Sequence, residues 1–382
     1  MDLELSLDQR AVVEDARRWL LDVLPPDYES RVAAYRLDLD FRRAYQRAAY
    51  EAGWLAPAAP RALGGRDLDP VTDLLVKVTF ARLEAPKLPN VQGPGVVAPA
   101  LSAFGSAEQR EHAVPILRGD EWWCLGMSEP GAGSDLASVR TSARRTADGF
   151  VIAGQKTWTS HARDSGWCLL FARTEATERP HRGITAFVVP MDRPGITVVP
   201  IAKLGSEDEE FCDVFYDDVR VPETAVLGAV NGGWQVAMES LAHERDMIWI
   251  MNMVEIERCV RITRRAEHRM VASRLEQSAA DAEALWLMGL RSVCARADGR
   301  PDRVGPMLKL FASEALERAV DLACDTTGPE SMLLGDTPES HGGFDLAAAD
   351  LEAVAAQIYG GTSEIQRNLI GERVLGLPRE YR

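Results

Sequence analysis

Apolar residues recur at every third or fourth position through the first 118 residues, which is the period of amphipathic α-helices. Residues 6–9 read Ser-Leu-Asp-Gln and have the form of a capping box, in which the first and last side chains satisfy each other's backbone N–H groups. Val12, Ala16 and Leu20 follow at helical spacing, and the same period returns over residues 41–51, 70–83 and 107–117. This pattern predicts an N-terminal α-helical domain of about five helices within residues 1–121.

After residue 121 the pattern changes to short runs of β-branched and aromatic residues separated by turn residues. The runs lie at residues 149–154, 167–172, 183–189, 196–199 and 211–221. Because short apolar runs with turn residues between them are typical of hairpins, the sequence predicts a central antiparallel β domain at residues 122–228.

Helical periodicity resumes at Gly232, and residues 234–270 contain neither proline nor glycine. They predict one helix of about 50 Å at 1.5 Å per residue. Residues 247–254 are apolar on nearly every side, so this part must be buried in a bundle or a subunit interface. Further helices are predicted at residues 275–297, 304–326 and 346–358. The expected fold class is α+β: N-terminal helices, a β domain and a C-terminal helical bundle at residues 229–382.

Composition narrows the range of partners. With 382 residues, of which 46% are hydrophobic, the chain can bury a large core. Its 43 Lys and Arg residues against 58 Asp and Glu residues give a formal net charge of −15, which repels nucleic-acid phosphates and anionic lipids. We expect neither nucleic acid nor a membrane as a partner. A phosphate-bearing ligand would need local donors such as backbone N–H groups, helix N-termini and a few arginines.

The cysteines and the N-terminal residues indicate the cellular compartment of the protein. Six cysteines occur singly, without a Cys-x-x-Cys pair, which argues against a zinc site and against a disulfide framework. The first residues show no basic segment followed by an apolar stretch, and no uninterrupted apolar run reaches about 18 residues. These features predict a cytoplasmic protein with reduced thiols and no metal site.

Three segments carry groups suited to ligand binding. Residues 125–135 place Gly131 and Gly133, which let a backbone approach a ligand closely, beside the hydroxyls of Ser128 and Ser134. Taken alone, this segment favours an ordinary loop over a ligand site.

The second segment spans residues 154–161, where Trp158 is followed by the hydroxyls of Thr159 and Ser160. Such a tryptophan can cover the face of an aromatic ring while the hydroxyls bond its edge, although a half-buried tryptophan of a β domain is an alternative. In the third segment, residues 358–370, two glycines precede Thr362, which can cap a helix with Glu364 in its first turn. The free N–H groups of this helix could hold a phosphate or carbonyl oxygen. Taken alone, the segment favours a simple helix start without a ligand.

Five motifs in one order resemble those of the flavin-dependent acyl-CoA dehydrogenase family. They are Met-Ser-Glu-Pro-Gly-Ala-Gly-Ser-Asp (127–135), Gly-Gln-Lys-x-Trp (154–158), Asp-Val-Arg-Val-Pro (218–222), Asn-Gly-Gly-Trp (231–234), and Gly-Gly-Thr-Ser-Glu-Ile-Gln-Arg-Asn (360–368) with Glu-Arg-Val-Leu-Gly-Leu-Pro-Arg (372–379). The resemblance covers the whole chain, and the predicted α, β, α order agrees with it. It implies an FAD enzyme of lipid metabolism and fatty acid β-oxidation, forming a homo-oligomer (dimer or tetramer) or a heterotetramer.

The resemblance also implies roles for individual residues. Those expected to contact the flavin ring or the FAD diphosphate are Leu125, Met127, Ser128, Trp158, Thr159, Ser160, Thr362 and Glu364. A carboxylate at Glu364 is unusual, since many relatives have Gln there and a negative charge beside a diphosphate is unfavourable unless it faces away. Those expected to bind the CoA thioester are Ser134, Arg245 and Gly361.

The family reaction removes the α-proton of an acyl thioester and passes the β-hydrogen to the flavin, which gives a trans-2-enoyl thioester. It needs a carboxylate base and donors on the thioester oxygen. Many members carry the base immediately before Gly-Thr, where this chain has Gly360. A minority that resembles actinobacterial steroid and branched-chain enzymes places it on the long helix, which makes Glu244 the expected base. The Gly360 N–H would then be an oxyanion donor, and an electron-transferring flavoprotein the expected electron acceptor.

The region after the long helix also departs from the family pattern. The usual Arg-x-Gln-Phe-Gly segment is absent from residues 269–277, so either Arg269 or Arg274 holds the FAD diphosphate or the subunit assembly differs. Two alternatives therefore stay open: a relative that uses flavin and oxygen to oxidise amines, and a flavin-poor partner subunit of a heterotetramer. The choice between CoA and an acyl-carrier protein, and the acyl chain itself, also stay open.

Overall fold

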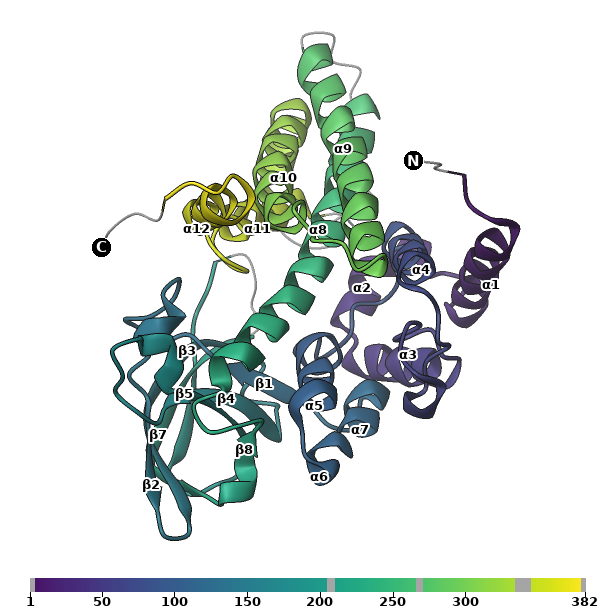
Figure 1. The fold of residues 1–382 in the computed structure, drawn as a ribbon. Coiled ribbons are helices and arrows are strands. Elements are labelled where there is room, and N and C mark those ends of the chain that lie inside the picture. Colours follow the sequence, from purple (N-terminus) through teal and green to yellow (C-terminus); the bar gives the residue numbers. More distant parts are fainter. Residues whose placement is uncertain (1–3, 205–209, 266–270, 334–344, 379–382) are drawn as a thin grey trace. The chain divides into compact units, whose positions relative to one another are not determined.

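The computed structural model describes residues 4–204, 210–265, 271–333 and 345–378, apart from the side chains of residues 33 and 242–246. Its contacts divide the chain into two compact units (Figure 1). One unit, the β unit, comprises residues 88–244, and the other, the helical unit, comprises residues 1–87 and 245–382. Helix α8 (Gly233–Arg265) contributes its first turns to the β unit and its remainder to the helical unit.

In the described part of the β unit, eight strands form one sheet in the order β6-β7-β3-β2-β4-β5-β8, and β1 pairs with β4. The strands are β1 (Trp123–Gly126), β2 (Ser142–Thr146), β3 (Gly149–Ser160), β4 (Trp167–Arg173), β5 (Ile184–Pro190), β6 (Ile196–Pro200), β7 (Phe211–Val221) and β8 (Val226–Leu227). The predicted antiparallel pairing is confirmed for most neighbours, whereas β1 and β2 pair with β4 in parallel.

Strands β4 and β5 are buried at nearly every position, which is why they read as continuous apolar runs without alternation. Their side chains share one core with Phe150, Ile152 and Val214 from β3 and β7. Short helices precede the sheet: a π-helical turn (Gly93–Val97), α5 (Ala98–Phe104), α6 (Ala107–Arg110) and α7 (Ala113–Arg118). The Gln109 amide donates to the carbonyl oxygens of Thr224 and Val226 at 3.0 and 3.1 Å, which joins α6 to β8.

The helical unit contains the remaining long helices (Figure 1). They are α1 (Leu7–Val23), α2 (Val32–Leu37), α3 (Leu39–Glu51), α4 (Pro70–Arg82), α9 (Ala272–Ala297), α10 (Gly305–Thr327), α11 (Leu346–Ala356) and α12 (Ser363–Leu369), the last continued by a π-helical turn (Ile370–Val374). The capping box predicted at Ser6 and Gln9 is confirmed at the start of α1. The predicted helix at residues 234–270 is confirmed as far as Arg265, and residues 266–270 lie outside the described residues.

The core of the helical unit forms where α8 packs against α9. Trp249 and Met253 of α8 are buried there, so the apolar stretch predicted at residues 247–254 lies in a bundle core, although Met251 remains exposed. Gly289 makes the close approach possible, because a Cβ at this position would stand 2.2 Å from the Trp249 ring. The ion pair between Arg258 of α8 and Glu84 after α4, at 2.7 Å, adds a polar link at the edge of this core.

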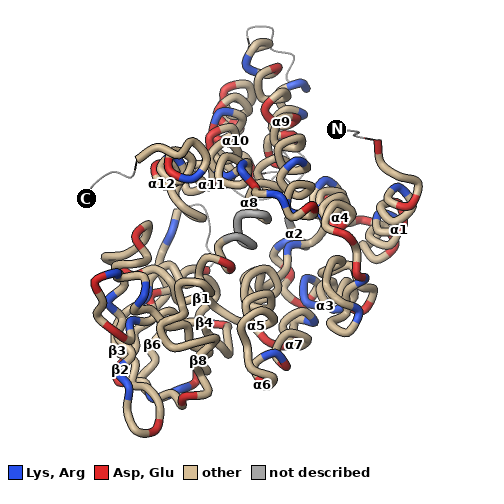
Figure 2. The backbone as a smooth tube through the Cα atoms, in the orientation of Figure 1, with Lys and Arg blue, Asp and Glu red and all other residues tan. Residues whose placement is uncertain are grey.

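Charge of both signs is interspersed along α1, α9 and α10 rather than gathered by sign (Figure 2). On these helices, cationic residues therefore occur beside acidic ones in spite of the net charge of −15. Among the described residues, none of the helices combines the length and apolar content that crossing a bilayer requires. The described residues also hold no group of three or more His, Cys, Asp or Glu residues arranged to ligate a metal.

Candidate functional site

The structure brings two of the sequence motifs together at one end of the β unit. The chain leaves β1 at Gly126, and Thr157 of β3 donates its backbone N–H to the Ser128 carbonyl oxygen at 2.9 Å. Leu125, Met127 and Ser128 are half-buried, so their groups lie at the boundary between core and surface. The segment predicted to contact a ring and the segment predicted to cover it are thus neighbours.

Trp158 has an unusual backbone and an unusual exposure. Its φ is +56°, and the pairing of β3 with β7 shifts register between Lys156 and Thr159 around it. Left-handed backbone at a bulky residue costs about 1–3 kcal/mol. Nevertheless the Trp158 side chain is 58% exposed, and its ring makes an edge contact with Phe211 at 5.9 Å between ring centroids. An exposed aromatic ring held on a strained backbone is suited to stacking against a planar ligand.

The two hydroxyl residues that follow are placed differently. Thr159 is fully buried, opposite Cys212 of β7, and among the described residues its Oγ1 finds no hydrogen-bond partner. Ser160 is half-buried, on the same side of the strand as Trp158. Ser160 is therefore the better placed of the two to meet a ligand that lies on the Trp158 ring.

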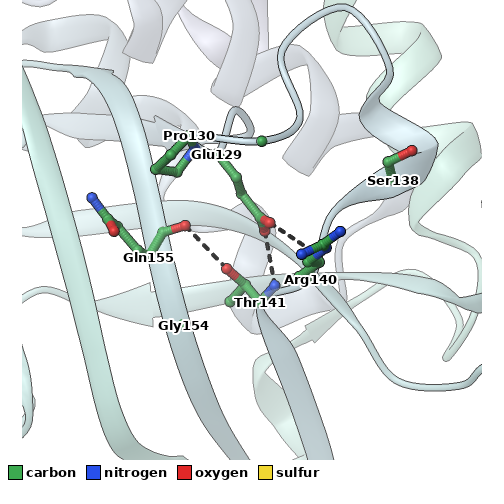
Figure 3. Close-up of a pocket in the computed structure, with 8 residues that line it drawn as sticks. Glu129, Pro130, Ser138, Arg140, Thr141, Gly154 and Gln155 are labelled. Atoms are coloured by element: carbon green, nitrogen blue, oxygen red, sulfur yellow. Dashed lines mark hydrogen bonds between the residues drawn. The ribbon is translucent and has the colours of Figure 1, made fainter.

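A buried ion pair lies directly behind these segments. Lys156 Nζ is 2.8 Å from Glu129 Oε1, and both side chains are withdrawn from solvent. The Glu129 carboxylate also accepts from the backbone N–H groups of Arg140 at 2.6 Å and Thr141 at 2.9 Å (Figure 3). Burial acts to raise the pKa of Glu129, yet the Lys156 ammonium and these donors together lower that pKa below its ordinary value. Burial lowers the pKa of Lys156, and Glu129 offsets part of this effect.

A cavity of about 230 Å³ opens beside Glu129 (Figure 3). It is lined by Glu129, Pro130, Gly131, Ser138, Arg140, Thr141, Gly154 and Gln155. Space is also open at Gly131 and Gly133, where a Cβ would meet no atom within 4 Å, and Ser134 is exposed. The loop between Glu129 and Asp135 is thus accessible to a ligand along most of its length.

The third motif lies in the helical unit. Gly360 and Gly361 have φ of +64° and +97°, values that only glycine adopts without strain. Thr362 caps α12 by accepting from the Ile365 N–H at 3.3 Å, as predicted. Glu364 is exposed in its first turn, where local hydrogen bonds lower its pKa.

Gly360 is in close contact with α8. A Cβ at this position would stand 2.6 Å from Ile248 Cδ1 and 3.8 Å from Cε of the buried Lys309. The buried Gln366 amide donates to the Gly360 carbonyl oxygen at 3.3 Å. The loop therefore has no room for a side chain at residue 360 unless Ile248 moves.

Several predicted residues cannot be placed in full. Positions 244 and 245 belong to the α8 backbone, but the side chains of Glu244 and Arg245 lie outside the described part of the structure, as does Arg269. Arg274 is described, and it pairs with Asp325 at 2.6 Å. Its guanidinium is thus engaged by a neighbouring carboxylate.

Sequence reasoning missed the ion pair between Glu129 and Lys156. Both residues stand inside the motifs that were singled out, at positions where charged residues of a surface loop are expected. The available signal was strand alternation: Lys156 lies on the same side of β3 as the buried core residues.

Comparisons with known proteins agree with this arrangement. The chain matches the acyl-CoA dehydrogenase N-terminal domain at residues 6–120, the middle domain at residues 124–219 and the C-terminal domain at residues 231–375. It is 37% identical to the acyl-CoA dehydrogenase IpdE1 of Mycobacterium tuberculosis over 89% of each chain.

Solved structures give the same result. The chain superposes on the Tcur3481-Tcur3483 steroid ACAD with a TM-score of 0.87 and 27% identity, covering all of both chains. A second match, also over both full chains, is the ChsE4-ChsE5 complex from Mycobacterium tuberculosis, with a TM-score of 0.85 and 27% identity. From these domain matches and the similarity to IpdE1 over most of its length, the chain belongs to the flavin-dependent acyl-CoA dehydrogenase family, oxidoreductases that act on CH–CH groups.

Proposed function

We propose that this chain binds FAD and converts an acyl-CoA into its trans-2-enoyl-CoA, with Glu244 as the base. The observation that carries this proposal is the contact between Gly360 and Ile248. The position that holds a glutamate in many family members is a glycine here, and Ile248 Cδ1 stands 2.6 Å from where its Cβ would lie. Position 244 stands one helical turn before Ile248, on the same side of α8, so a carboxylate supplied from the helix would replace the missing one.

The β unit offers a surface that fits the flavin. Trp158 presents an exposed ring for stacking, and Ser128 and Ser160 stand beside it with hydroxyls at the boundary of the core. We assign Leu125, Met127 and Thr159 to the same flavin-binding wall, with Thr159 acting from the core side. Thr362 and Glu364 would meet the diphosphate region, with the Glu364 carboxylate turned toward solvent.

When bound, FAD would supply the acceptor for the β-hydrogen of the substrate. The residues of the chain do the rest. Glu244 takes the α-proton, and the Gly360 N–H donates to the thioester oxygen as negative charge develops there. Ser134, Arg245 and Gly361 hold the CoA portion, with the Arg245 guanidinium offsetting phosphate charge. An electron-transferring flavoprotein would then reoxidise the enzyme.

The test is anaerobic bleaching of the flavin absorbance by acyl-CoA. We expect the Glu244→Gln variant to retain FAD and to bleach at least 100-fold more slowly, because the proton has no acceptor. Glu239→Gln on the same helix, at an exposed position, is the matched control and should bleach at the wild-type rate. A Glu244→Gln variant that bleaches normally contradicts the assignment of the base.

One relative supports a proposal for the substrate class. One structural match is titled a steroid ACAD, and we propose a bulky or branched acyl-CoA of this kind as the substrate. A bleaching screen across short, straight long, branched and steroid side-chain acyl-CoAs tests this. Fastest bleaching by a short straight chain contradicts it.

We also propose that the active form is an oligomer, either of this chain alone or with a related chain. Leu351, Val354 and Ile358 form an exposed apolar stripe along and just after α11, at the spacing of one helix face. One of the structural matches is titled a complex of two chains. Light scattering of the purified chain, alone and after co-expression with a related dehydrogenase chain, distinguishes these forms. A monodisperse, fully active monomer contradicts both.

A further inference from the structure

Three consecutive residues after β1 are each bound to the Gly-Gln-Lys-x-Trp segment. The Lys156 ammonium donates to the Met127 carbonyl oxygen at 3.0 Å and to Glu129 at 2.8 Å. Between these two bonds, the Thr157 N–H donates to the Ser128 carbonyl oxygen at 2.9 Å. Lys156 and its neighbour thus determine where the backbone of residues 127–129 lies.

The bond from Lys156 sets the orientation of one peptide group. In a trans peptide the C=O of one residue and the N–H of the next point in opposite directions. Because the Met127 carbonyl turns toward the buried ammonium, the Ser128 N–H points away from the interior of the β unit. Among the described residues, none accepts a hydrogen bond from that N–H.

The aliphatic stem of Lys156 packs beneath β1 on its way to the Met127 carbonyl oxygen. It passes beneath Gly126, where a Cβ would stand 3.6 Å from Lys156 Cγ and 2.8 Å from Leu170 Cδ1. The tight contact of such a Cβ is with Leu170, and its distance to the lysine stem is that of ordinary van der Waals packing. Glu129 in turn is fixed by two backbone donors, the N–H groups of Arg140 and Thr141, so it holds the ammonium from a rigid position.

A fold alone does not require this arrangement. Burying two charges is expensive, and well-packed apolar residues of similar volume often give equal or greater stability. A buried cation bonded to a carbonyl has a second effect, because it polarises the peptide and strengthens the N–H on its far side as a donor. That N–H belongs to Ser128, beside the exposed Trp158 ring.

We propose that Lys156 is a positioning residue for the flavin. Its ammonium orients the peptide between Met127 and Ser128, so that the Ser128 N–H is presented to the flavin ring as a strengthened donor. The inference rests on the proposed function, since it requires that the chain binds FAD through this wall of the β unit.

The test compares three variants with the wild-type protein: Lys156→Met, Glu129→Gln and the double variant. FAD affinity is measured by titrating deflavinated protein with FAD, and the flavin midpoint potential by equilibration with redox dyes. Thermal unfolding of the deflavinated proteins is measured in parallel. Met keeps the length of the lysine stem and Gln the shape of the carboxylate, so each single variant removes one charge.

We expect Lys156→Met to weaken FAD binding by about tenfold or more, the loss expected for a hydrogen bond that depends on a charged group. Its midpoint potential should shift to lower values, because a positive charge near reduced flavin is gone. Glu129→Gln should shift the potential to higher values. Opposite shifts distinguish an electrostatic role from a loss of packing, which would not change sign between the two variants.

The double variant separates positioning from folding. With both charges removed, the unfolding temperature should return toward that of the wild type, because no unpaired buried charge remains. FAD affinity should stay low, since the Met127 carbonyl has lost its ammonium. If affinity returns together with stability, Lys156 serves only the ion pair and the inference is overturned.

A control variant and two further outcomes complete the test. Arg145→Met breaks an exposed ion pair with Glu223 in the same unit and should leave affinity and potential unchanged. A wild-type protein that binds FAD, with Lys156→Met binding it as tightly, overturns the inference and leaves the proposed function standing. A wild-type protein without affinity for FAD overturns both.

Discussion

The loop after β1 and the loop before α12 both carry glycines beside predicted ligand groups, but they are held by different means. In the β unit, the loop from residue 127 to residue 129 is fixed by a buried ammonium, a carboxylate and a backbone hydrogen bond. In the helical unit, the loop at Gly360 packs closely against α8. This packing needs a glycine, because Ile248 Cδ1 lies where a Cβ at residue 360 would stand.

The difference bears on what each loop can do. Charge placed behind the β1 loop can act on a bound ring through the intervening peptide. Gly360 presents backbone only, so a carboxylate that acts near it would have to come from another residue. We propose that Glu244 of α8 is that residue.

The largest expected effect comes from breaking the buried pair on its acidic side. Glu129→Ala leaves the Lys156 ammonium buried without its carboxylate and leaves two backbone N–H groups without an acceptor. We expect a loss of about 3–5 kcal/mol in the free energy of unfolding. Urea unfolding followed by circular dichroism measures it. Glu223→Ala, which removes the partner of Arg145 on the surface, should cost less than about 1 kcal/mol.

Adding a single methyl group at Gly360 should lower the free energy of unfolding. In Gly360→Ala the Cβ would stand 2.6 Å from Ile248 Cδ1, on a backbone with φ of +64°. Crowding and left-handed backbone together should cost about 2–4 kcal/mol. Ile248→Val removes the Cδ1 atom that is in the way, so the double variant should recover the crowding part while the backbone cost remains. A Gly360→Ala variant that loses only the backbone cost of about 1–2 kcal/mol would show that Ile248 is free to move.

A third effect depends on pH. The folded-state pKa of Glu129 is lowered, so its contribution to stability is present above the unfolded-state pKa of about 4.5 and is lost as pH falls through the folded-state value. Wild type and Glu129→Gln should therefore differ in urea midpoint at pH 7, and this difference should shrink below pH 4.5. A difference that is constant from pH 3 to pH 7 would mean that the pKa of Glu129 is the same in the folded and unfolded states, and a difference that falls as pH rises above 4.5 would mean that the carboxylate is neutral in the folded protein.

The sequence predicted those features of the fold that depend on hydrophobic periodicity and on short local motifs. The capping box at Ser6, the long helix α8 and the cap at Thr362 all depend on short-range patterns, and each is confirmed. The parallel pairing of β1 with β4 was not predicted, because it joins residues more than forty positions apart and leaves no local pattern.

The candidate site was predicted less completely, for two physical reasons. The sequence motifs identified Trp158 and Gly360 as candidate site residues. Their backbone dihedrals, and close contacts such as that of Gly360 with Ile248, can be seen only in the structure. The buried state of Lys156 was hidden because lysine is almost always exposed, and its burial depends on a carboxylate that is 27 residues away.

The smallest effect on stability is expected at Trp158, and it tests whether that residue serves a ligand. Trp158 is 58% exposed at a φ of +56°, so its side chain contributes little to the core while its backbone is strained. Asn adopts this left-handed conformation more readily than Trp. Trp158→Asn should therefore keep the free energy of unfolding or raise it by up to about 1 kcal/mol, and at the same time weaken FAD binding. A residue that serves folding would show the reverse: lower stability with unchanged affinity. Measured together by urea unfolding and FAD titration, the two numbers decide whether strain at this position is retained for the sake of a stacking surface.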